Sequence, residues 1–247
     1  MTWTIAAAGA VGGAIVGSFV ATICIRWPEG RQVLTGRSSC DHCKRTLGAA
    51  ELIPVLSSAM ARGRCRSCGG KIAPLHLGVE LGAASLAAVA LLLQPNVSGL
   101  ALALFWLLLV GPAILDARHL WLPNSLTAIL AFPGLLFGGL ATGAALTDRL
   151  AGGAAGFLVL ALVAAAYAAL RGRQGMGAGD PKLFGAIGLW TGWMPLPFIL
   201  VIASVAGLAL ALARGRAAGD RMPFGSLMAA GAIIWSGVEV YRQGGAF

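Results

Sequence analysis

Long apolar segments recur along the chain, and short polar or glycine-rich connections separate each from the next. A helix needs about 20 apolar residues to cross the hydrocarbon core of a bilayer, so segments near this length predict membrane-spanning helices. The pattern therefore predicts an all-α polytopic membrane protein with about eight transmembrane helices. These apolar segments lie near residues 3–25, 76–93, 100–115, 125–142, 151–170, 182–194, 196–213 and 224–241. The segment 182–194 is short for a perpendicular span, and a re-entrant helix is the alternative there.

One segment breaks the apolar pattern, and it sets the predicted domain organisation. Residues 26–75 are polar and rich in Arg, Gly and Cys. A core of this size is marginal without a metal or disulfide to staple it. We therefore predict a first transmembrane helix at 1–25, a small stapled domain at 26–75, and a helical membrane domain at 76–247. The first segment lacks a basic region before it and a small-residue cleavage site after it, so we interpret it as a retained span.

The basic residues indicate an orientation in the membrane. The chain is 58% hydrophobic, only 11% charged, and has a net charge of +9. If the first helix starts outside, sixteen Lys and Arg residues fall on the inner side, and only Arg149 and Arg242 fall outside. This asymmetry follows the positive-inside rule. We conclude that the basicity reflects a lipid bilayer as partner and no nucleic acid, because no nucleic-acid motif accompanies it.

Four of the five cysteines form a pattern typical of a metal site. Cys40 and Cys43 make one Cys-x-x-Cys pair, and Cys65 and Cys68 make a second, with 21 residues between the pairs. Two such pairs complete a tetrahedral four-thiolate site for Zn²⁺, and a site closed in this way is structural. Two disulfides are the alternative, which a reducing inner compartment disfavours.

Two aspartates stand at the ends of apolar segments where charge is otherwise rare. Asp116 closes the third segment, and Asp180 ends the run from Gly175 that contains Gly177 and Gly179. Ionisable groups near lipid usually pair or carry out chemistry, and two adjacent carboxylates share one proton, as in aspartic proteolysis. The structural alternatives are an Asp116 paired with Arg118 and an Asp180 that caps the following helix, with Pro181 in its first turn.

Four further residues are weaker candidates. Lys182 is placed to hold one aspartate ionised, or else serves as an orientation charge. Glu80 is an acid within the second apolar segment and thus a candidate for function. Asn124 or Ser125, after Pro123, is a candidate cap for the next helix.

At these residues the chain resembles the type IV prepilin peptidases, a family of membrane aspartyl proteases with a Gly-x-Gly-Asp motif. The resemblance covers almost the whole chain and rests on several motifs in order. The matching segments are Gly17-Ser18-Phe19 with Arg26-x-Pro28, the two cysteine pairs, Glu51-Leu52-Ile53-Pro54-Val55-Leu56-Ser57, Asp116 with Leu122-Pro123, Gly175-Met176-Gly177-x-Gly179-Asp180-x-Lys182-Leu183, and Pro223-Phe224-Gly225.

The resemblance implies a function. Asp116 and Asp180 would activate water to cleave the leader of a prepilin or pseudopilin after a Gly, on the cytoplasmic side of the bacterial inner membrane. Gly177, Gly179 and Lys182 would support the second aspartate. Many members also methylate the new N-terminus with S-adenosylmethionine, for which Glu51 and Glu80 are candidate contacts.

The chain departs from the family pattern at three places. Leu75-His76-Leu77 stands where Arg-Tyr-Pro is frequent, and Leu52 stands where Asn is common. Pro181 follows the second aspartate, where other residues are usual. The first two lie in or beside the predicted cytoplasmic domain, so they bear on methyl transfer more than on proteolysis.

Two other classes of function also fit parts of the pattern. An ion- or proton-coupled transporter would use Asp116, Asp180 and Glu80 but gives no reason for a zinc-type domain. A membrane-tethered scaffold would use that domain for docking and would tolerate loss of both aspartates.

Overall fold

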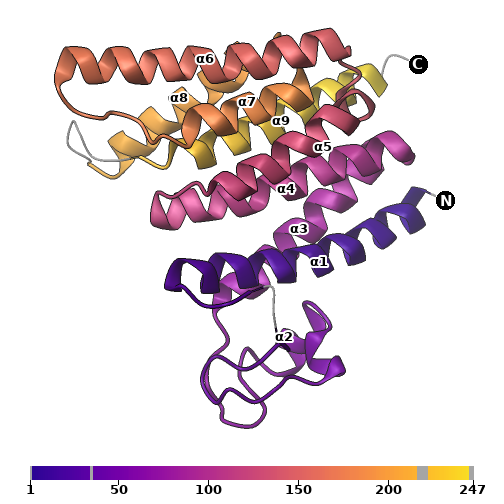
Figure 1. The fold of residues 1–247 in the computed structure, drawn as a ribbon. Coiled ribbons are helices and arrows are strands. Elements are labelled where there is room, and N and C mark those ends of the chain that lie inside the picture. Colours follow the sequence, from indigo (N-terminus) through magenta and orange to yellow (C-terminus); the bar gives the residue numbers. More distant parts are fainter. Residues whose placement is uncertain (1, 34–35, 216–221, 245–247) are drawn as a thin grey trace. The chain divides into compact units, whose positions relative to one another are not determined.

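The computed structural model describes residues 2–33, 36–215 and 222–244 and shows helices joined by short connections (Figure 1). Contacts divide the chain into two compact units, Met1–Leu92 and Leu93–Phe247. In the described part of the chain the α-helices are α1 (Thr2–Arg26), α2 (Leu56–Met60), α3 (Pro74–Leu93), α4 (Val97–His119), α5 (Asn124–Thr142), α6 (Leu146–Arg171), α7 (Asp180–Thr191), α8 (Leu196–Ala213) and α9 (Phe224–Gly244).

Among the described residues, seven helices are long and apolar enough to cross a membrane. They correspond to seven of the eight predicted spans. The remaining predicted span, near 182–194, is α7, which has only 12 residues. This length is below that of a perpendicular span, as the sequence pattern indicated for this segment.

In the first unit, small residues bring α1 and α3 into close contact. Gly9, Gly13 and Gly17 recur every fourth residue on α1, so they share one face of the helix. A Cβ added at Gly13 or Gly17 would come within 2.8 Å of the Cβ of Ala87 or Ala83 on α3. Such small-residue faces let helix backbones approach closely in lipid, where packing replaces the hydrophobic effect.

The second unit is a bundle built around the short helix α7. Helix α7 packs against α5 and α6 and also contacts α9, and α4 contacts both α5 and α9. Ten of its twelve residues are buried. Its Gly188 faces Gly152 of α6 so closely that an added Cβ would overlap the backbone there.

The C-terminal end of α7 is anchored by an aromatic residue and a threonine. Trp190 donates a hydrogen bond from Nε1 to the Leu130 carbonyl (2.8 Å) and stacks on Phe105 at 4.9 Å between ring centroids. Thr142 Oγ1 donates to the Trp190 carbonyl (2.8 Å). These bonds tie the C-terminal end of α7 to α5.

Arg149 takes part in the packing of this bundle, although its sequence position indicated only an outer charge. The side chain is 7% exposed. Its Nη1 donates hydrogen bonds to the carbonyls of Gly134 (2.8 Å) and Leu135 (3.1 Å) on α5. The guanidinium therefore fastens α6 to α5.

Candidate active site

Asp116 lies one turn before the end of α4, with its side chain only 5% exposed. Helix α4 ends where Leu120 adopts a left-handed conformation (φ 50°) and its N–H returns to the Asp116 carbonyl. The Asp116 side chain instead accepts a hydrogen bond at Oδ2 from the backbone N–H of Ser226, at 2.7 Å. Within the described residues it forms no ion pair with Arg118, so the structural alternative for this residue is not observed.

Asp180 is the first residue of α7 and is 6% exposed. Gly179, not Asp180, occupies the N-cap position. The Asp180 carboxylate turns back and accepts the N–H of Gly177 at 3.1 Å. The capping alternative is therefore wrong in its geometry, because this carboxylate bonds the glycine loop and not the N–H groups of its own helix.

The two aspartates lie close enough to influence each other. Burial, together with the neighbouring charge of Asp116, raises the pKa of Asp180 to about 6, against the opposing effect of the Gly177 N–H. Two buried carboxylates that share one region can hold one proton between them, which provides one acid and one base.

The glycines of the second motif allow this approach. A Cβ at Gly179 would lie 2.5 Å from the Cβ of Leu122, in the loop after α4. A Cβ at Gly177 would lie 3.3 Å from Oδ2 of Asp180. A side chain at Gly179 would therefore push the two aspartate-bearing segments apart, and one at Gly177 would press on the Asp180 carboxylate.

Lys182 connects the same two segments in an unexpected way. Its Nζ donates a hydrogen bond to Oδ1 of Asn124 at 2.7 Å. Asn124 is the first residue of α5, whose N-cap is Pro123, so the expectation that Asn124 caps this helix is wrong. The bond instead joins the start of α5, which follows the loop after α4, to the helix that begins with Asp180.

Sequence reasoning missed the contribution of α9. Only the segment Pro223-Phe224-Gly225 gave an indication, as a motif without a role. In the structure, a Cβ at Gly225 would lie 3.1 Å from Oδ2 of Asp116 and 2.8 Å from Cδ1 of Leu122. The first turn of α9 therefore lies directly against the Asp116 carboxylate.

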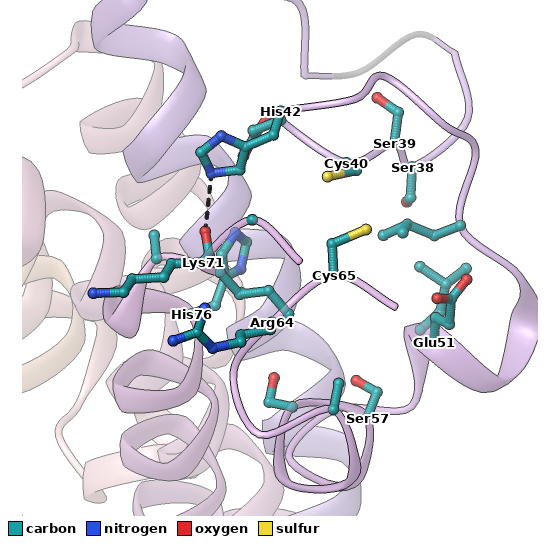
Figure 2. A pocket seen from close by; sticks show the side chains of 18 of the residues that line it. Ser38, Ser39, Cys40, His42, Glu51, Ser57, Arg64, Cys65, Lys71 and His76 are labelled. Atoms are coloured by element: carbon teal, nitrogen blue, oxygen red, sulfur yellow. Dashed lines mark hydrogen bonds between the residues drawn. The ribbon is translucent and has the colours of Figure 1, made fainter. Parts of the chain in front are cut away.

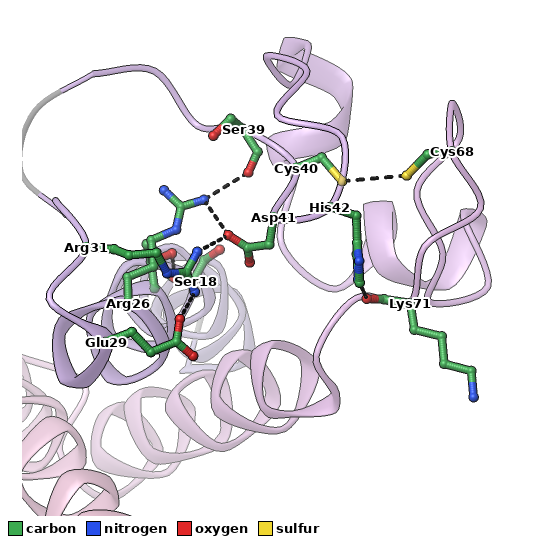
Figure 3. A network of polar contacts seen from close by, with 11 residues as sticks. Ser18, Arg26, Glu29, Arg31, Ser39, Cys40, Asp41, His42, Cys68 and Lys71 are labelled. Atoms are coloured by element: carbon green, nitrogen blue, oxygen red, sulfur yellow. Dashed lines mark hydrogen bonds and ion pairs between the residues drawn. The ribbon is translucent and has the colours of Figure 1, made fainter.

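The four cysteines of the first unit form a compact cluster. The Sγ atoms of Cys40, Cys43, Cys65 and Cys68 all lie within 4.8 Å of one another, and those of Cys40 and Cys68 are 3.9 Å apart (Figure 3). Four thiolates at about 2.3 Å from one zinc ion would have sulfurs roughly 3.8 Å apart. The donor set and its spacing therefore fit one tetrahedrally bound metal ion.

Each cysteine pair sits in the same backbone turn. Cys40 N–H donates to the Arg45 carbonyl (2.9 Å), and Cys65 N–H donates to the Gly70 carbonyl (2.8 Å). Lys44 and Gly69 occupy equivalent positions and are both left-handed, at φ 59° and 69°. The two pairs therefore share one tight turn, closed by a left-handed residue four positions after the first cysteine of each pair.

The backbone of this turn also acts on the cysteine sulfur. Backbone N–H groups of Cys68 and Ser67 point at the Cys65 thiol and lower its pKa, whereas, against the effect of the Gly70 N–H, burial and the neighbouring thiols raise the pKa of Cys68. A low thiol pKa favours the thiolate, which is the metal-binding form.

A cavity of about 160 Å³ lies within the first unit, and Figure 2 shows residues that line it. Glu80 and Glu51 both line this cavity. Glu80 is 4% exposed and accepts the N–H of Val55 at 2.8 Å. Val55 has φ 63°, which is unfavourable for a β-branched residue, so this hydrogen bond holds a strained turn. Glu51 is bound on both oxygens, by Arg45 (2.6 Å) and by the Gly48 N–H (2.9 Å).

Arg26 and Asp41 line the cavity and belong to a network of charged residues (Figure 3). Arg26 donates to the Ser39 carbonyl (2.8 Å) and pairs with Asp41 (3.2 Å). Arg31 bridges Asp41 and Glu29, at 2.6 Å to each. Burial opposes ionisation of Asp41, but its hydrogen bond with Arg31 and the charge of Arg26 prevail and lower its pKa. These pairs fix the segment after α1 against the cysteine domain.

Comparison with known proteins places both units in one family. Residues 11–94 match the bacterial peptidase A24 N-terminal domain, and residues 101–212 match the type IV leader peptidase family. The chain is 39% identical to the prepilin leader peptidase/N-methyltransferase of Aeromonas hydrophila over 211 residues, which are 82% of this chain and 73% of that protein. The chain belongs to the type IV leader peptidase family. No solved structure matches it.

Other relatives agree with this membership. A prepilin leader peptidase/N-methyltransferase of Burkholderia pseudomallei (strain K96243) is 41% identical over 83% of this chain and 69% of its own length. The type 4 prepilin-like proteins leader peptide-processing enzyme of Escherichia coli O78:H11 is 32% identical over 90% of both chains. With its apolar helices, this leader peptidase family member is a multi-pass membrane protein.

Proposed function

We propose that this protein is a membrane aspartic endopeptidase that cleaves the leader peptide of type IV prepilins or pseudopilins after a Gly residue. The observation that carries the proposal is the pair of buried carboxylates, Asp116 and Asp180, at adjoining segments of one bundle. Membership of the type IV leader peptidase family supplies the substrate class.

The mechanism that we propose is general acid–base hydrolysis of the peptide bond. The ionised carboxylate removes a proton from a water molecule as the water oxygen attacks the scissile carbonyl carbon. The protonated carboxyl donates its proton to the carbonyl oxygen, giving a tetrahedral diol. The carboxyl that took the water proton then passes it to the amide nitrogen, while the other carboxylate takes a proton from a diol hydroxyl. The carbon–nitrogen bond breaks to give an acid and an amine, and the pair again holds one proton.

The remaining motif residues act in support of the pair. Gly177 donates its N–H to Asp180, and Gly179 allows close contact with Leu122. Lys182, through Asn124, keeps the two segments together at their solvent side. None of the three needs to contact the reacting bond.

We place the site on the cytoplasmic side of the bacterial inner membrane. The support is the distribution of charge, because the connections that follow α1, α4, α6 and α8 carry most of the Lys and Arg residues. Asp116 and Asp180 lie next to two of these basic connections, and the cysteine domain is itself the connection that follows α1.

We further propose Zn²⁺ as the metal of the cysteine cluster, with a structural role. Four thiolates would fill all positions of a tetrahedral ion, so no position is left open for a substrate. The reducing cytoplasm suits thiolates better than disulfides.

A second activity, methyl transfer to the new N-terminus, is favoured by the cavity of the first unit. The names of several relatives include N-methyltransferase. S-adenosylmethionine would supply the methyl group when bound. Glu80 is the residue we propose to contact the substrate amine or the methyl donor, since Val55 occupies only one of its oxygens. Glu51, bound on both oxygens, would shape the cavity wall.

The test is cleavage of a synthetic prepilin N-terminal segment by purified protein in detergent, read by mass spectrometry with S-adenosylmethionine present. We expect a cut after the leader Gly that Asp116→Asn and Asp180→Asn each reduce by at least a thousandfold, because each removes half of the acid–base pair. One added methyl group on the mature fragment, lost in Glu80→Gln, would support the second activity.

Arg118→Gln is the matched control, because this exposed residue lies beside Asp116 outside the pair. It should cleave normally. Retained activity in either Asn variant would refute the pair. No cut with a range of leaders would favour proton-coupled transport, which flux into liposomes would then reveal.

A further inference from the structure

The two aspartates of the proposed catalytic pair have different hydrogen-bond environments. Asp116 accepts the Ser226 N–H at 2.7 Å, and the Gly225 N–H also points at its carboxylate. Among the described residues, Asp180 accepts one N–H, from Gly177, at 3.1 Å. Backbone N–H groups bond a carboxylate more strongly than a neutral acid, so the better-supplied residue favours the charged form.

The donors of Asp116 also come from a special place in the fold. Ser226 is the third residue of α9, a helix of 21 residues. First-turn N–H groups have no partner inside their own helix, and the helix dipole adds positive potential there. Asp180 also begins a helix, but its carboxylate bonds the loop at Gly177 instead.

No other charged group competes for this role among the described residues. Asp180 of α7 faces Asp116. Arg118 and His119 of α4 are exposed, and Lys182 of α7 bonds Asn124 of α5. Glu239 and Arg242 of α9 stand more than three turns from Ser226, and α5 and α8 contain no charged residue.

We propose that the first turn of α9 is part of the catalytic centre: its backbone N–H groups hold Asp116 as the ionised carboxylate, so the transferable proton resides on Asp180. This inference rests on the proposed peptidase function, and it goes beyond it by assigning base and acid. Ser226 and Gly225 are positioning residues, since they act through Asp116.

The test of positioning is a pair of variants at one residue. Ser226→Pro removes the N–H that Asp116 accepts, and proline is tolerated in the first turn of a helix. Ser226→Ala keeps the N–H and removes only the hydroxyl, which bonds the Pro223 carbonyl (2.7 Å). We expect Ser226→Pro to lower kcat at least tenfold with KM little changed, and Ser226→Ala to lower kcat clearly less, because its N–H still reaches Asp116.

The pH profile separates this role from a purely structural one. The acid limb of kcat/KM reports loss of the base, so in Ser226→Pro it should move upward by about one pH unit, a tenfold change in the ionisation constant. Gly225→Ala, whose Cβ would press on the carboxylate, should shift the same limb. A uniform loss of rate with an unmoved acid limb would overturn the proposal.

Chemical labelling tests the assignment without any proteolysis. An epoxide is opened by an ionised carboxylate, whereas a diazoacetyl reagent esterifies a protonated carboxyl. We expect the epoxide on Asp116 and the diazoacetyl group on Asp180, located by peptide mass mapping at pH 5. The reverse pattern would overturn the assignment even if cleavage is normal, and a failure of cleavage with the expected pattern would refute only the peptidase function.

Discussion

At the scale of single residues, the burial of Asp180 should make the stability of the second unit depend on pH. The pKa of Asp180 is raised to about 6 in the folded protein, mainly by burial and then by Asp116, whereas an unfolded Asp titrates near about 3.9. The folded state thus binds this proton more tightly. Its contribution is fully present below about pH 4 and is lost as the pH rises through about 6.

We therefore expect wild-type protein in detergent to lose thermal stability between about pH 5 and pH 7.5, and Asp180→Asn to lose much less. At about 1.4 kcal/mol per pKa unit, the effect is on the order of 2–3 kcal/mol at most. Thermal unfolding followed by the fluorescence of the native tryptophans would measure it. Equal pH dependence in wild type and variant would contradict the expectation.

The sequence identified the two candidate catalytic residues but not the hydrogen bonds that position them. Asp116 and Asp180 were identifiable because charge is rare beside apolar segments. The Lys182–Asn124 and Ser226–Asp116 hydrogen bonds were not, since they join residues 58 and 110 positions apart. Only the packing of α4, α5, α7 and α9 brings these partners together.

At the scale of elements, α7 is positioned by glycine contacts, which gives a second prediction. Gly188→Ala would place a Cβ against the backbone of Gly152. Overpacking of this kind costs about 1–3 kcal/mol, and α7 carries Asp180. We expect a lower midpoint of thermal unfolding and at least a tenfold loss of cleavage.

The matched control is Gly82→Ala on α3. A Cβ there meets no atom within 4 Å. Alanine is also the better helix former by about 0.8–1 kcal/mol. This variant should be neutral or slightly stabilised, and equal effects of the two substitutions would contradict the role assigned to the α6–α7 contact.

Apolar length predicted the long helices well but could not predict the packing of α7. Segments such as 196–213 have the same bounds in the sequence pattern and in α8. The short helix at 180–191 is buried by partners from α5 and α6. Its stability thus comes from tertiary contacts that hydropathy does not report.

At the scale of the whole molecule, the two units depend on different forces. The cysteine domain has few helical residues and a small core, so a metal ion should supply much of its folding free energy. We expect about one zinc per chain by mass spectrometry of the metal, and its loss in Cys40→Ser but not in Cys24→Ser, whose cysteine is buried in α1.

Chelation should then expose residues 36–73 to proteolysis while α4–α9 stay protected, because the second unit contains no cysteine. Resistance of residues 36–73 after the metal is removed would show that the domain folds without it.

The cysteine spacing predicted this cluster, but the sequence did not predict the repeated turn around Lys44, since lysine gives no indication of a left-handed backbone.

The hydrogen bond from Ser226 to Asp116 has a consequence for biosynthesis. The donor residue is synthesised 110 residues after the acceptor, so most helices of the bundle have left the ribosome before α9 does. Until that helix inserts, Asp116 lacks the groups that favour its charge. A nascent or truncated chain would carry both aspartates and yet remain inert, which would spare other membrane proteins from premature cutting during assembly.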